Sequence, residues 1–376
     1  MKGVLIYPVD IDDPRSAGVV SKMRAQHLAF QSASLKTDII TTKNGEVLIY
    51  RKKSDFPEIY RVNNILPVKH FALHIKLLTL AQDQEYDFLY IRYSLITPFF
   101  IRFLKLLKKT NRRQKVLLEL PTFPMAKEYR GFPRKIFYWF SSLLARRHLP
   151  KLVDRIVVYG KQSKVYQIPS IRIRNGADLS MFPLKQKKKG GKIRLIATGR
   201  WAFWHGLDRV LTGLGNYCRK SRVPNIEMIV IGDGPELRKL RNLSSKLGLE
   251  SIVNFIGPLK AGELDFHFDH ADIAIGSLGA HRKDLDIVSS LKHREYAARG
   301  IPFILSDLDP DFPQELSWIR YFPVNNEPII ISEVINFFES ISKESIISQK
   351  IRRYAETNLT WNQKLLPVFN YILGKR

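Results

Sequence analysis

Residues 192–214 have the sequence KIRLIATGRWAFWHGLDRVLTGL, in which a strand pattern gives way to a helical one. Ile193–Thr198 is largely apolar, which is typical of a strand buried on both faces. A loop with Gly199 and Arg200 follows, and apolar positions then recur at the spacing of an amphipathic helix. Because a strand that passes through a glycine loop into a helix is the repeating unit of α/β proteins, this stretch predicts a doubly wound parallel sheet.

The same alternation extends over the rest of the 376-residue chain, which is long enough for two domains. The strand candidates fall into two sets. The sequence therefore predicts an α/β protein of two doubly wound, Rossmann-like domains that face each other across a cleft at the carboxyl ends of their strands. The candidates are Gly3–Tyr7, Thr37–Thr41, Phe88–Arg92, Val116–Leu120 and Arg155–Tyr159, then Ile193–Thr198, Glu227–Ile231, Val253–Ile256, Ile273–Gly276 and Phe303–Ser306.

Between the two sets lies PLKQKKKGGK, residues 183–192, which holds Lys, Gly and Pro but little that is apolar. This composition predicts a linker. We expect an N-terminal, acceptor-side domain over residues 1–182 and a C-terminal domain, which binds the ligand of the cleft, over residues 193–359. The last helical pattern, about 360–376, is expected to pack back on the first domain.

The net charge of +26 is unevenly distributed. The part through Gly190 holds 36 Lys and Arg against 14 Asp and Glu, a net charge of +22, and Ile101–Pro150 alone holds 13 against 2. A field of this kind favours an anionic partner, either nucleic acid or an anionic lipid surface. The alternative is a solvated basic face that only aids solubility.

Two basic stretches, FFIRFLKLLKKTNRRQK (99–115) and FPRKIFYWFSSLLARRHLPKL (132–152), have apolar residues at helical spacing. The pattern suits helices at an anionic membrane interface, although the apolar faces could equally pack on the sheet. We expect both at once: helices packed on the core with a basic outer rim at the lipid. The expected membrane-facing cations are Lys105, Lys108, Lys109, Arg112 and Arg113.

The expected location is the cytoplasm, peripherally on the inner face of the plasma membrane. No apolar run reaches the ~20 residues that span a bilayer, and the single cysteine, Cys218, fits a reducing compartment. The N-terminal MKGVLIYPVD resembles a first strand more than a signal peptide. The nine histidines show no spacing typical of a zinc site.

Several residues at strand ends of the second set are suited to bind phosphate. Arg200 could hold a phosphate bidentately, although it could instead be a surface arginine paired with an acid. Gly232 and Gly234 indicate a tight turn, and Leu237 replaces the third glycine of the dinucleotide fingerprint, which disfavours a nicotinamide cofactor.

A helix that ends at Gly300 has Ser289 or Ser290 as its candidate N-cap. Its first-turn amides predict an anion site. Glu295, further along this helix, could accept hydrogen bonds from ribose hydroxyls.

In series, these motifs resemble the nucleotide-binding domain of the retaining family-4 glycosyltransferases, which have the GT-B architecture. The resemblance covers some 130 residues in the family's order and spacing. It rests on RNGADLSMF (174–182), TGRWAFWHGLDRVL (198–211), IGDGPELRKL (231–240), NFIGPL (254–259), ADIAIGS (271–277) and LKHREYAARGIPFI (291–304).

The resemblance implies a role for each matching residue. Arg200 would neutralise the donor diphosphate, and Glu295, the second glutamate of the family motif, would hold the ribose; both are counted among the catalytic residues. The amides of Ser289, Ser290 and Leu291 would cradle phosphate. The other implied donor contacts are Gly199, Gly232 and the backbone from Ile256 to Leu259.

Two positions depart from the family pattern. His205 stands where the family has a second phosphate-binding lysine, so phosphate binding is expected to be weaker or pH-sensitive. Lys292 is the candidate to replace that lysine as a phosphate ligand. Ile287 replaces the first motif glutamate, which helps to seat the donor sugar, and Asp286 is the nearest acid.

The N-terminal domain resembles the family more loosely. Gly18 lies in the expected first strand-to-helix loop, where it would approach the donor. No histidine occupies the strand end at which many members contact the donor sugar, and Glu119 is the substitute candidate. A carboxylate at such a place is also commonly a helix-capping partner.

The resulting hypothesis is a metal-independent, retaining glycosyltransferase of the hexosyltransferase type. Its donor would be a nucleotide diphosphate sugar, with UDP expected, and its acceptor a saccharide or lipid-linked saccharide in bacterial surface-polysaccharide synthesis. The Asp307–Asp309 triplet is not assigned a metal, because Arg200 would neutralise the diphosphate. No cofactor and no nucleic acid are expected. The alternatives are an inactive relative that acts as a partner subunit, or a basic nucleic-acid-binding protein.

Overall fold

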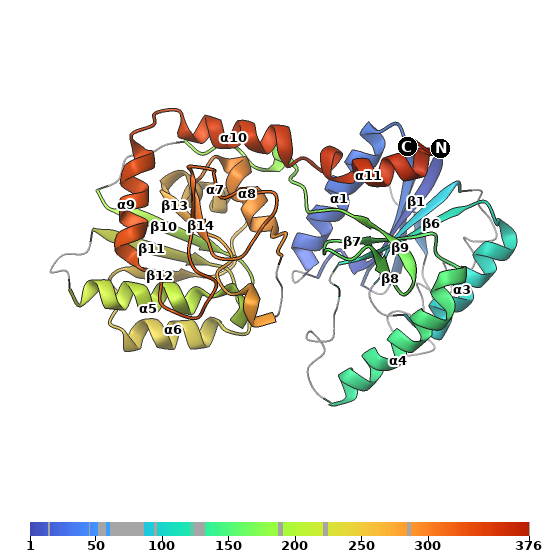
Figure 1. The fold of residues 1–376 in the computed structure, drawn as a ribbon, viewed down its shortest axis with the longest axis horizontal. Coiled ribbons are helices and arrows are strands. Elements are labelled where there is room, and N and C mark those ends of the chain that lie inside the picture. The colour runs from blue at the N-terminus through green and yellow to red at the C-terminus, as the bar shows by residue number, and fades with distance from the viewer. Residues whose placement is uncertain are drawn as a thin grey trace. The chain divides into compact units, whose positions relative to one another are not determined.

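The computed structural model divides into two compact units, each an α/β sheet with helices on both faces (Figure 1). The first unit comprises Met1–Arg174 and Trp361–Arg376, and the second comprises Asn175–Thr360. The predicted class, an α/β protein of two Rossmann-like domains, is confirmed. The residues described are 1–376 except 14–15, 45, 52–57, 61–85, 94–95, 122, 124–131, 187–190, 221–224, 284–286 and 376.

In its described part, the first unit holds a nine-stranded sheet in the order β4-β3-β2-β1-β5-β6-β7-β9-β8. The strands from β2 to β9 in this order are parallel, and antiparallel pairs close both edges. Central β1 is buried over Val4–Tyr7 because helices cover both of its faces. The bounds are β1 Lys2–Asp10, β2 Lys36–Lys43, β3 Glu46–Tyr50, β4 Glu58–Tyr60, β5 Phe88–Arg92, β6 Lys115–Leu120, β7 Arg155–Val158, β8 Lys164–Val165 and β9 Ile168–Arg172.

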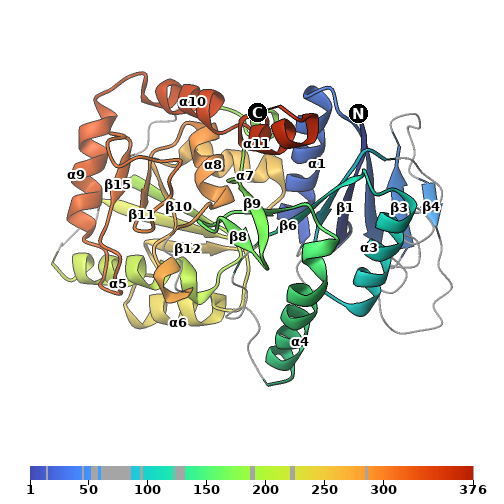
Figure 2. The ribbon, with the colours of Figure 1, turned by 45° about the vertical axis from the view of Figure 1, so that its right-hand side comes forward.

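In the part of the chain that the structure describes, four helices cover this first sheet. On one face α1 (Ala17–Ser32) packs beside α11 (Trp361–Leu373), and Figure 2 shows the two side by side. Lys115 Nζ donates to the Tyr371 carbonyl over 3.0 Å, which fastens α11 to β6. The other face is covered by α3 (Pro98–Thr110) and α4 (Phe132–His148). None of the described helices is both long and apolar enough to cross a membrane.

The second unit has, in its described residues, a six-stranded parallel sheet in the order β12-β11-β10-β13-β14-β15. Helices α5, α6 and α9 pack on one face, and α7, α8 and α10 pack on the other. The strands are β10 Ile193–Thr198, β11 Ile226–Ile231, β12 Val253–Ile256, β13 Ile273–Ile275, β14 Phe303–Leu305 and β15 Ile319–Tyr321; the helices are α5 Leu207–Cys218, α6 Leu237–Lys246, α7 Ala261–His270, α8 Leu291–Arg299, α9 Ile331–Ser342 and α10 Ile347–Asn358.

Two placements differ from the sequence-based expectation. Gly18 lies in the first turn of α1 and not in the loop before it, because the helix already begins at Ala17. The units divide between Arg174 and Asn175, ahead of the segment 183–192 that we expected to be the linker. In its described part that segment runs along the second unit, where the Lys185 amide donates to the Arg299 carbonyl over 2.9 Å.

Candidate functional site

The loops after β10 and β11 cross at the carboxyl edge of the second sheet. Trp201 N donates to Asp233 O over 2.6 Å at the crossing. Gly232 and Gly234 have φ of +117° and +147°, and a Cβ on them would lie 2.0 Å from Gly199 O and 2.3 Å from Trp201 O. Only glycine permits both the backbone conformation and this approach.

Arg200 lies beside this crossing, at the end of β10. Its neighbour Trp201 is fully buried, whereas Arg200 is exposed. Among the described residues no hydrogen bond or ion pair is found for the Arg200 guanidinium. The geometry therefore leaves five N–H donors and a positive charge available to a ligand.

His205 ends the short 3-10 helix Phe203–His205 and packs edge-on to Trp201, with 5.7 Å between ring centroids. Its Nδ1 accepts a hydrogen bond from the Ala202 amide over 2.9 Å, which places the ring proton on Nε2. Burial and the neighbouring Lys292 lower the pKa of His205 to about 3. His205 is consequently a neutral N–H donor and does not supply the cation found at this place in the family.

Lys292, in the first turn of α8, also lies beside Trp201. Its ammonium is 5.9 Å from the centroid of that ring and donates to the Gly276 carbonyl over 2.7 Å. Burial lowers the pKa of Lys292 to about 7, and the carboxylate of Asp307 opposes this shift. Lys292 and His205 thus both lie beside the indole of Trp201, and Trp201 follows Arg200 in the chain.

The start of α8 has the N-cap expected from the sequence. Ser290 is the N-cap residue in extended conformation, and its side chain makes no capping bond to the described residues. The first amides of the helix, from Leu291 onward, have no intrahelical partner, an arrangement that suits an anion. Ser289 instead braces the loop: its Oγ accepts from the Asn175 amide over 2.8 Å.

Glu295 is mostly buried on the next turn of α8. Its carboxylate accepts from Arg299 Nε over 2.9 Å, and Arg299 also donates to Asp265 over 2.6 Å. Burial raises the pKa of Glu295, while Arg299 acts in the opposite direction. One carboxylate oxygen has a partner inside the helix, which leaves the other for the proposed ribose contact.

The end of β12 was expected to face a base through its backbone. The side chains of Ile256 and Leu259 pack against the core of the second unit. The Gly232 amide already donates to the Ile256 carbonyl over 3.2 Å and to the Gly257 carbonyl over 3.3 Å. The backbone of Pro258 and Leu259 is the part of this segment that still suits such a contact.

The sequence did not predict the buried hydrogen bonds and ion pairs that hold α8 in place. Asp309 accepts from His293 over 2.9 Å and pairs with Arg294, which together keep its pKa far below the usual range although burial acts against ionisation. Asp307 Oδ2 accepts from Ser277 Oγ over 2.6 Å. The only signal in the sequence is the stretch LSDLDP (305–310), whose paired acids are also typical of a metal triplet.

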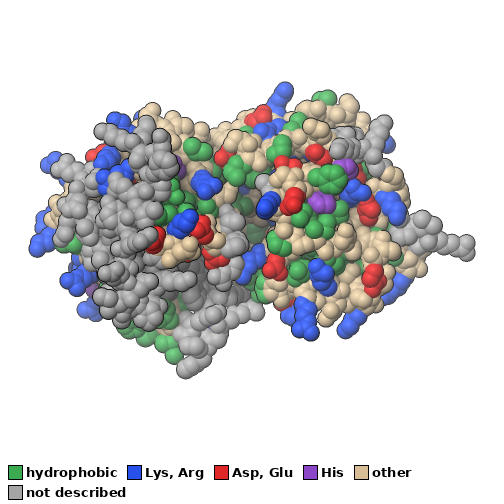
Figure 3. Space-filling view, turned by 180° about the vertical axis from the view of Figure 1, so that it is seen from behind, with side chains coloured by type: hydrophobic (Ala, Val, Ile, Leu, Met, Phe, Trp, Pro, Cys, Tyr) green, Lys and Arg blue, Asp and Glu red, His purple; other side chains and the backbone are tan. Residues whose placement is uncertain are grey.

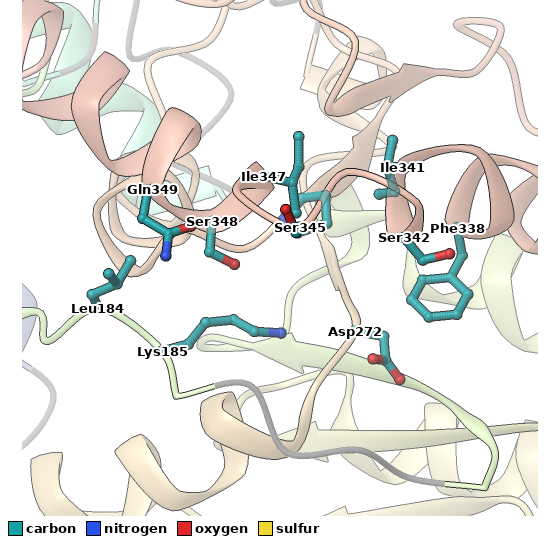
Figure 4. Close-up of a pocket in the computed structure, with 11 residues that line it drawn as sticks. Leu184, Lys185, Asp272, Phe338, Ile341, Ser342, Ser345, Ile347, Ser348 and Gln349 are labelled. Carbon is teal, nitrogen blue, oxygen red and sulfur yellow. The ribbon is translucent and has the colours of Figure 1, made fainter.

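Among the described residues, no group of three or more His, Cys, Asp and Glu side chains could hold a metal ion, and Asp286 lies outside these residues. Figure 4 shows a pocket lined by Lys185, Asp272 and the α9–α10 junction. Asp272 and Pro302 directly precede β13 and β14, so this pocket lies at the amino edge of the sheet, away from Arg200.

Glu119 occupies the corresponding carboxyl edge of the first sheet, but its carboxylate is fully buried. It accepts from Lys22 at 3.0 Å, Tyr90 at 2.6 Å and Tyr159 at 3.0 Å, and also from Gln26 and Arg92. Despite the cost of burial, Lys22 and Arg92 lower its pKa to about 2. This geometry gives Glu119 an internal structural role and leaves no free direction for the sugar contact that we expected.

The expected membrane cations divide into two groups. Lys108 bonds internally, to Asp154 Oδ2 and to the Gln114 carbonyl, both over 2.8 Å. It therefore cannot be counted as a lipid-facing charge. The others are exposed on α3 and the turn that follows it: Lys105, Lys109, Arg112 and Arg113.

Residues 182–316 match a family model described as "Glycosyl transferases group 1". The alpha-monoglucosyldiacylglycerol synthase of Streptococcus pneumoniae is 23% identical over 154 residues, 41% of this chain and 32% of that relative. The match thus spans about a third of the curated relative.

Two solved structures share the fold over nearly the whole chain. A glycosyltransferase from Rickettsia africae has a TM-score of 0.64 at 14% identity and covers 100% of this chain and 99% of its own. Anabaena HepE in complex with UDP and glucose has a TM-score of 0.59 at 12% identity and covers 99% and 100%. At these identities the likeness shows the fold, which is GT-B.

Proposed function

We propose that this chain, which carries a domain of the glycosyl transferases group 1 family in a GT-B fold, transfers a sugar from a nucleoside diphosphate donor. One observation carries the proposal. Exposed Arg200 directly precedes Trp201, and neutral His205 and Lys292 lie beside the ring of Trp201, with Lys292 in the first turn of α8. All of them lie inside the segment that matches the family. Cations and free N–H donors at one strand edge suit a diphosphate.

In the proposed reaction the bond between the anomeric carbon and the β-phosphate oxygen breaks, and its electron pair passes to the diphosphate. The acceptor hydroxyl oxygen bonds to the anomeric carbon, and its proton passes to the leaving phosphate. Negative charge grows on the diphosphate in the transition state, so Arg200 and the α8 amides would stabilise it most there. The family resemblance implies that the anomeric configuration is retained.

The proposed donor is a UDP-sugar, supported by the UDP complex of HepE. The proposed acceptor is a saccharide or a lipid-linked saccharide at the inner membrane face, in surface-polysaccharide assembly such as that of a capsule. Support comes from the Streptococcus pneumoniae relative, which is named for a glucosylated diacylglycerol, and from the basic first unit.

Donor hydrolysis and calorimetric binding across UDP-, GDP-, ADP- and dTDP-sugars test the proposal, with a parallel series in excess EDTA. We expect binding and slow hydrolysis of one nucleotide class, undiminished by EDTA. The absence of binding to every donor would overturn the proposal. Activity that EDTA removes and Mg²⁺ restores would overturn metal independence alone.

Neutral His205 and the apolar Ile287 also favour a second candidate, an inactive relative that acts as a partner subunit. This candidate predicts nucleotide binding without any turnover of the bound donor. Single-turnover mixing of the protein with radiolabelled donor distinguishes the two.

A further inference from the structure

Helix α4 carries a stripe of large apolar side chains that the first unit does not cover. Ile136 is 51% exposed, Trp139 65%, Phe140 51% and Leu143 49%. These positions follow the i, i+3, i+4, i+7 spacing, so they form one face of the helix. Phe137 flanks the stripe and is 54% exposed. We call these five residues the α4 stripe.

The opposite face of α4 is the one that packs on the unit. Ala145 is buried in the core, and Ser141 is buried with its Oγ accepting from the Ile96 amide over 2.7 Å. With the core-facing side fixed, the α4 stripe points away from the core. Figures 1 and 2 both show the N-terminal part of α4 extending beyond the sheet.

A second apolar face is not expected on a helix that only covers a sheet, because its outer side should be polar. Within the described part of the chain, no other helix has more than two exposed large hydrophobic residues. Contiguous exposed apolar patches mark interaction surfaces, whereas single exposed ones are ordinary. The α4 stripe therefore needs a partner that removes it from water.

The charges beside the α4 stripe indicate which partner. Lys135, Arg146 and Arg147 of α4 are exposed, as is Lys105 of α3. Burial and the charges of Lys105, Arg147 and Lys151 lower the pKa of His148, as expected where cations crowd together. Figure 3 shows Lys and Arg side chains along the outer margin of the first unit, at the left of that view. An apolar helix face bordered by cations matches an anionic bilayer interface.

We propose that α4 lies in the interface of an anionic bilayer, with the α4 stripe at the boundary between headgroups and acyl chains and the cations of α3 and α4 at the headgroups. Trp139 suits this depth, since its ring is apolar and its N–H can reach the headgroups. The inference deepens the membrane part of the proposed function, but it does not depend on the donor or on turnover.

Vesicle flotation tests the proposal with the full chain. The vesicles contain phosphatidylglycerol and phosphatidylcholine in equal parts, or phosphatidylcholine alone. We expect binding to the anionic vesicles at about 0.1 M salt, weaker binding at about 1 M salt, and little binding to neutral ones. The triple variant Trp139→Ser/Phe140→Ser/Leu143→Ser should lower the partition coefficient roughly tenfold or more. Its matched control, Phe266→Ser/Ile330→Ser/Ile346→Ser, removes equally exposed residues of the second unit and should float as wild type does.

Fluorescence gives a second measurement that a folding defect cannot imitate. Brominated lipid should quench Trp139 in wild type, and Trp139→Phe should lose that quenching yet still float. The proposal fails if the triple variant floats as well as wild type, or if lipid does not quench Trp139. It also fails if the triple variant only abolishes self-association in sedimentation, because the stripe is then a contact between copies. Unchanged donor binding in the triple variant separates these outcomes from a failure of the proposed transferase function.

Discussion

The carboxyl edges of the two sheets carry charged residues in similar places but use them differently. In the first unit, Glu119 near the end of β6 is fully buried, and Lys22 and Arg92 neutralise it. In the second unit, Arg200 just after β10 is exposed. Lys292 uses one of its three N–H donors in a hydrogen bond to the Gly276 carbonyl. A charge at a strand end therefore does not by itself identify a ligand site.

The two edges differ in whether other groups of the protein already pair with the charged side chain. Glu119 has five internal partners, so a ligand would have to replace contacts that already stabilise the fold. Beside Trp201, the exposed Arg200 guanidinium has no partner among the described residues. This comparison predicts that substitutions in the first group change stability, while those in the second change binding and rate.

The largest expected effect belongs to Glu119. Glu119→Gln would leave Lys22 and Arg92 buried without a counter-charge, and breaking such a buried group costs about 3–5 kcal/mol. Urea unfolding should measure this loss in the free energy of unfolding. The matched control is Glu356→Gln, which opens the more exposed pair with Arg352 and should cost at most about 1 kcal/mol.

The contribution of Glu119 to the free energy of unfolding should depend on pH in a definite direction. The folded pKa of Glu119 is about 2, below its ordinary 4.5, so its stabilising contribution is complete above the unfolded pKa. That contribution should decrease as the pH falls from 4.5 toward 2. A gap between wild type and Glu119→Gln that stays constant across this window would contradict the assignment.

Arg200→Ala is the second prediction, and its effect should fall on rate. The guanidinium contact with the diphosphate strengthens as charge develops, so its loss should lower turnover about a hundredfold or more. Stability should stay at the wild-type value because Arg200 is exposed. Steady-state kinetics and urea unfolding check both statements.

Arg238→Ala serves as the control, since this arginine is equally exposed on α6 of the same unit. It should turn over as wild type does. Wild-type turnover in a folded Arg200→Ala protein would remove Arg200 from the site and weaken the contrast between the two sheet edges.

The sequence predicts β1, β2, β5, β6 and β7 of the first sheet and β10 to β14 of the second, because each contains a run of apolar residues that local composition reveals. It misses β3, β4, β8, β9 and β15, which are short and lie toward the sheet edges, where pairing with a neighbouring strand and not composition decides whether a strand forms. The sequence predicts Ser289 or Ser290 as the N-cap of α8, because capping is local, and the structure has Ser290 there. The internal roles of Glu119, Lys108 and Asp309 were not foreseen, because their partners lie far along the chain.

The third prediction concerns Lys292, whose pKa of about 7 makes its charge sensitive to pH near neutrality. A lysine is charged below its pKa, so this contact with the diphosphate should weaken as the pH rises through 7. Lys292→Gln should lower nucleoside diphosphate affinity about tenfold at pH 6, about 1.4 kcal/mol. The difference should shrink toward pH 8.5, which is about 1.5 units above that pKa.

Lys292→Arg is the matched control because arginine stays charged throughout this range. Its affinity should change with pH only as the ionisation of the nucleotide requires. Calorimetric titrations of the three proteins across the range isolate the contribution of the lysine. Parallel curves for wild type and Lys292→Arg would exclude a titrating lysine at the site.

The smallest expected effect is that of Glu295, which shares its carboxylate with Arg299. Glu295→Gln should weaken nucleoside diphosphate binding by roughly three- to tenfold, the value of one hydrogen bond to a ribose hydroxyl. The turnover number should change little, because the ribose is held alike in the ground and transition states. Titrating the variant with a nucleotide that lacks the ribose 2′-hydroxyl separates the two roles of this side chain. If Glu295 holds that hydroxyl, the variant and wild type bind the deoxynucleotide equally. If both nucleotides lose affinity to the same extent, Glu295 acts only through Arg299 and the packing of α8 on α7.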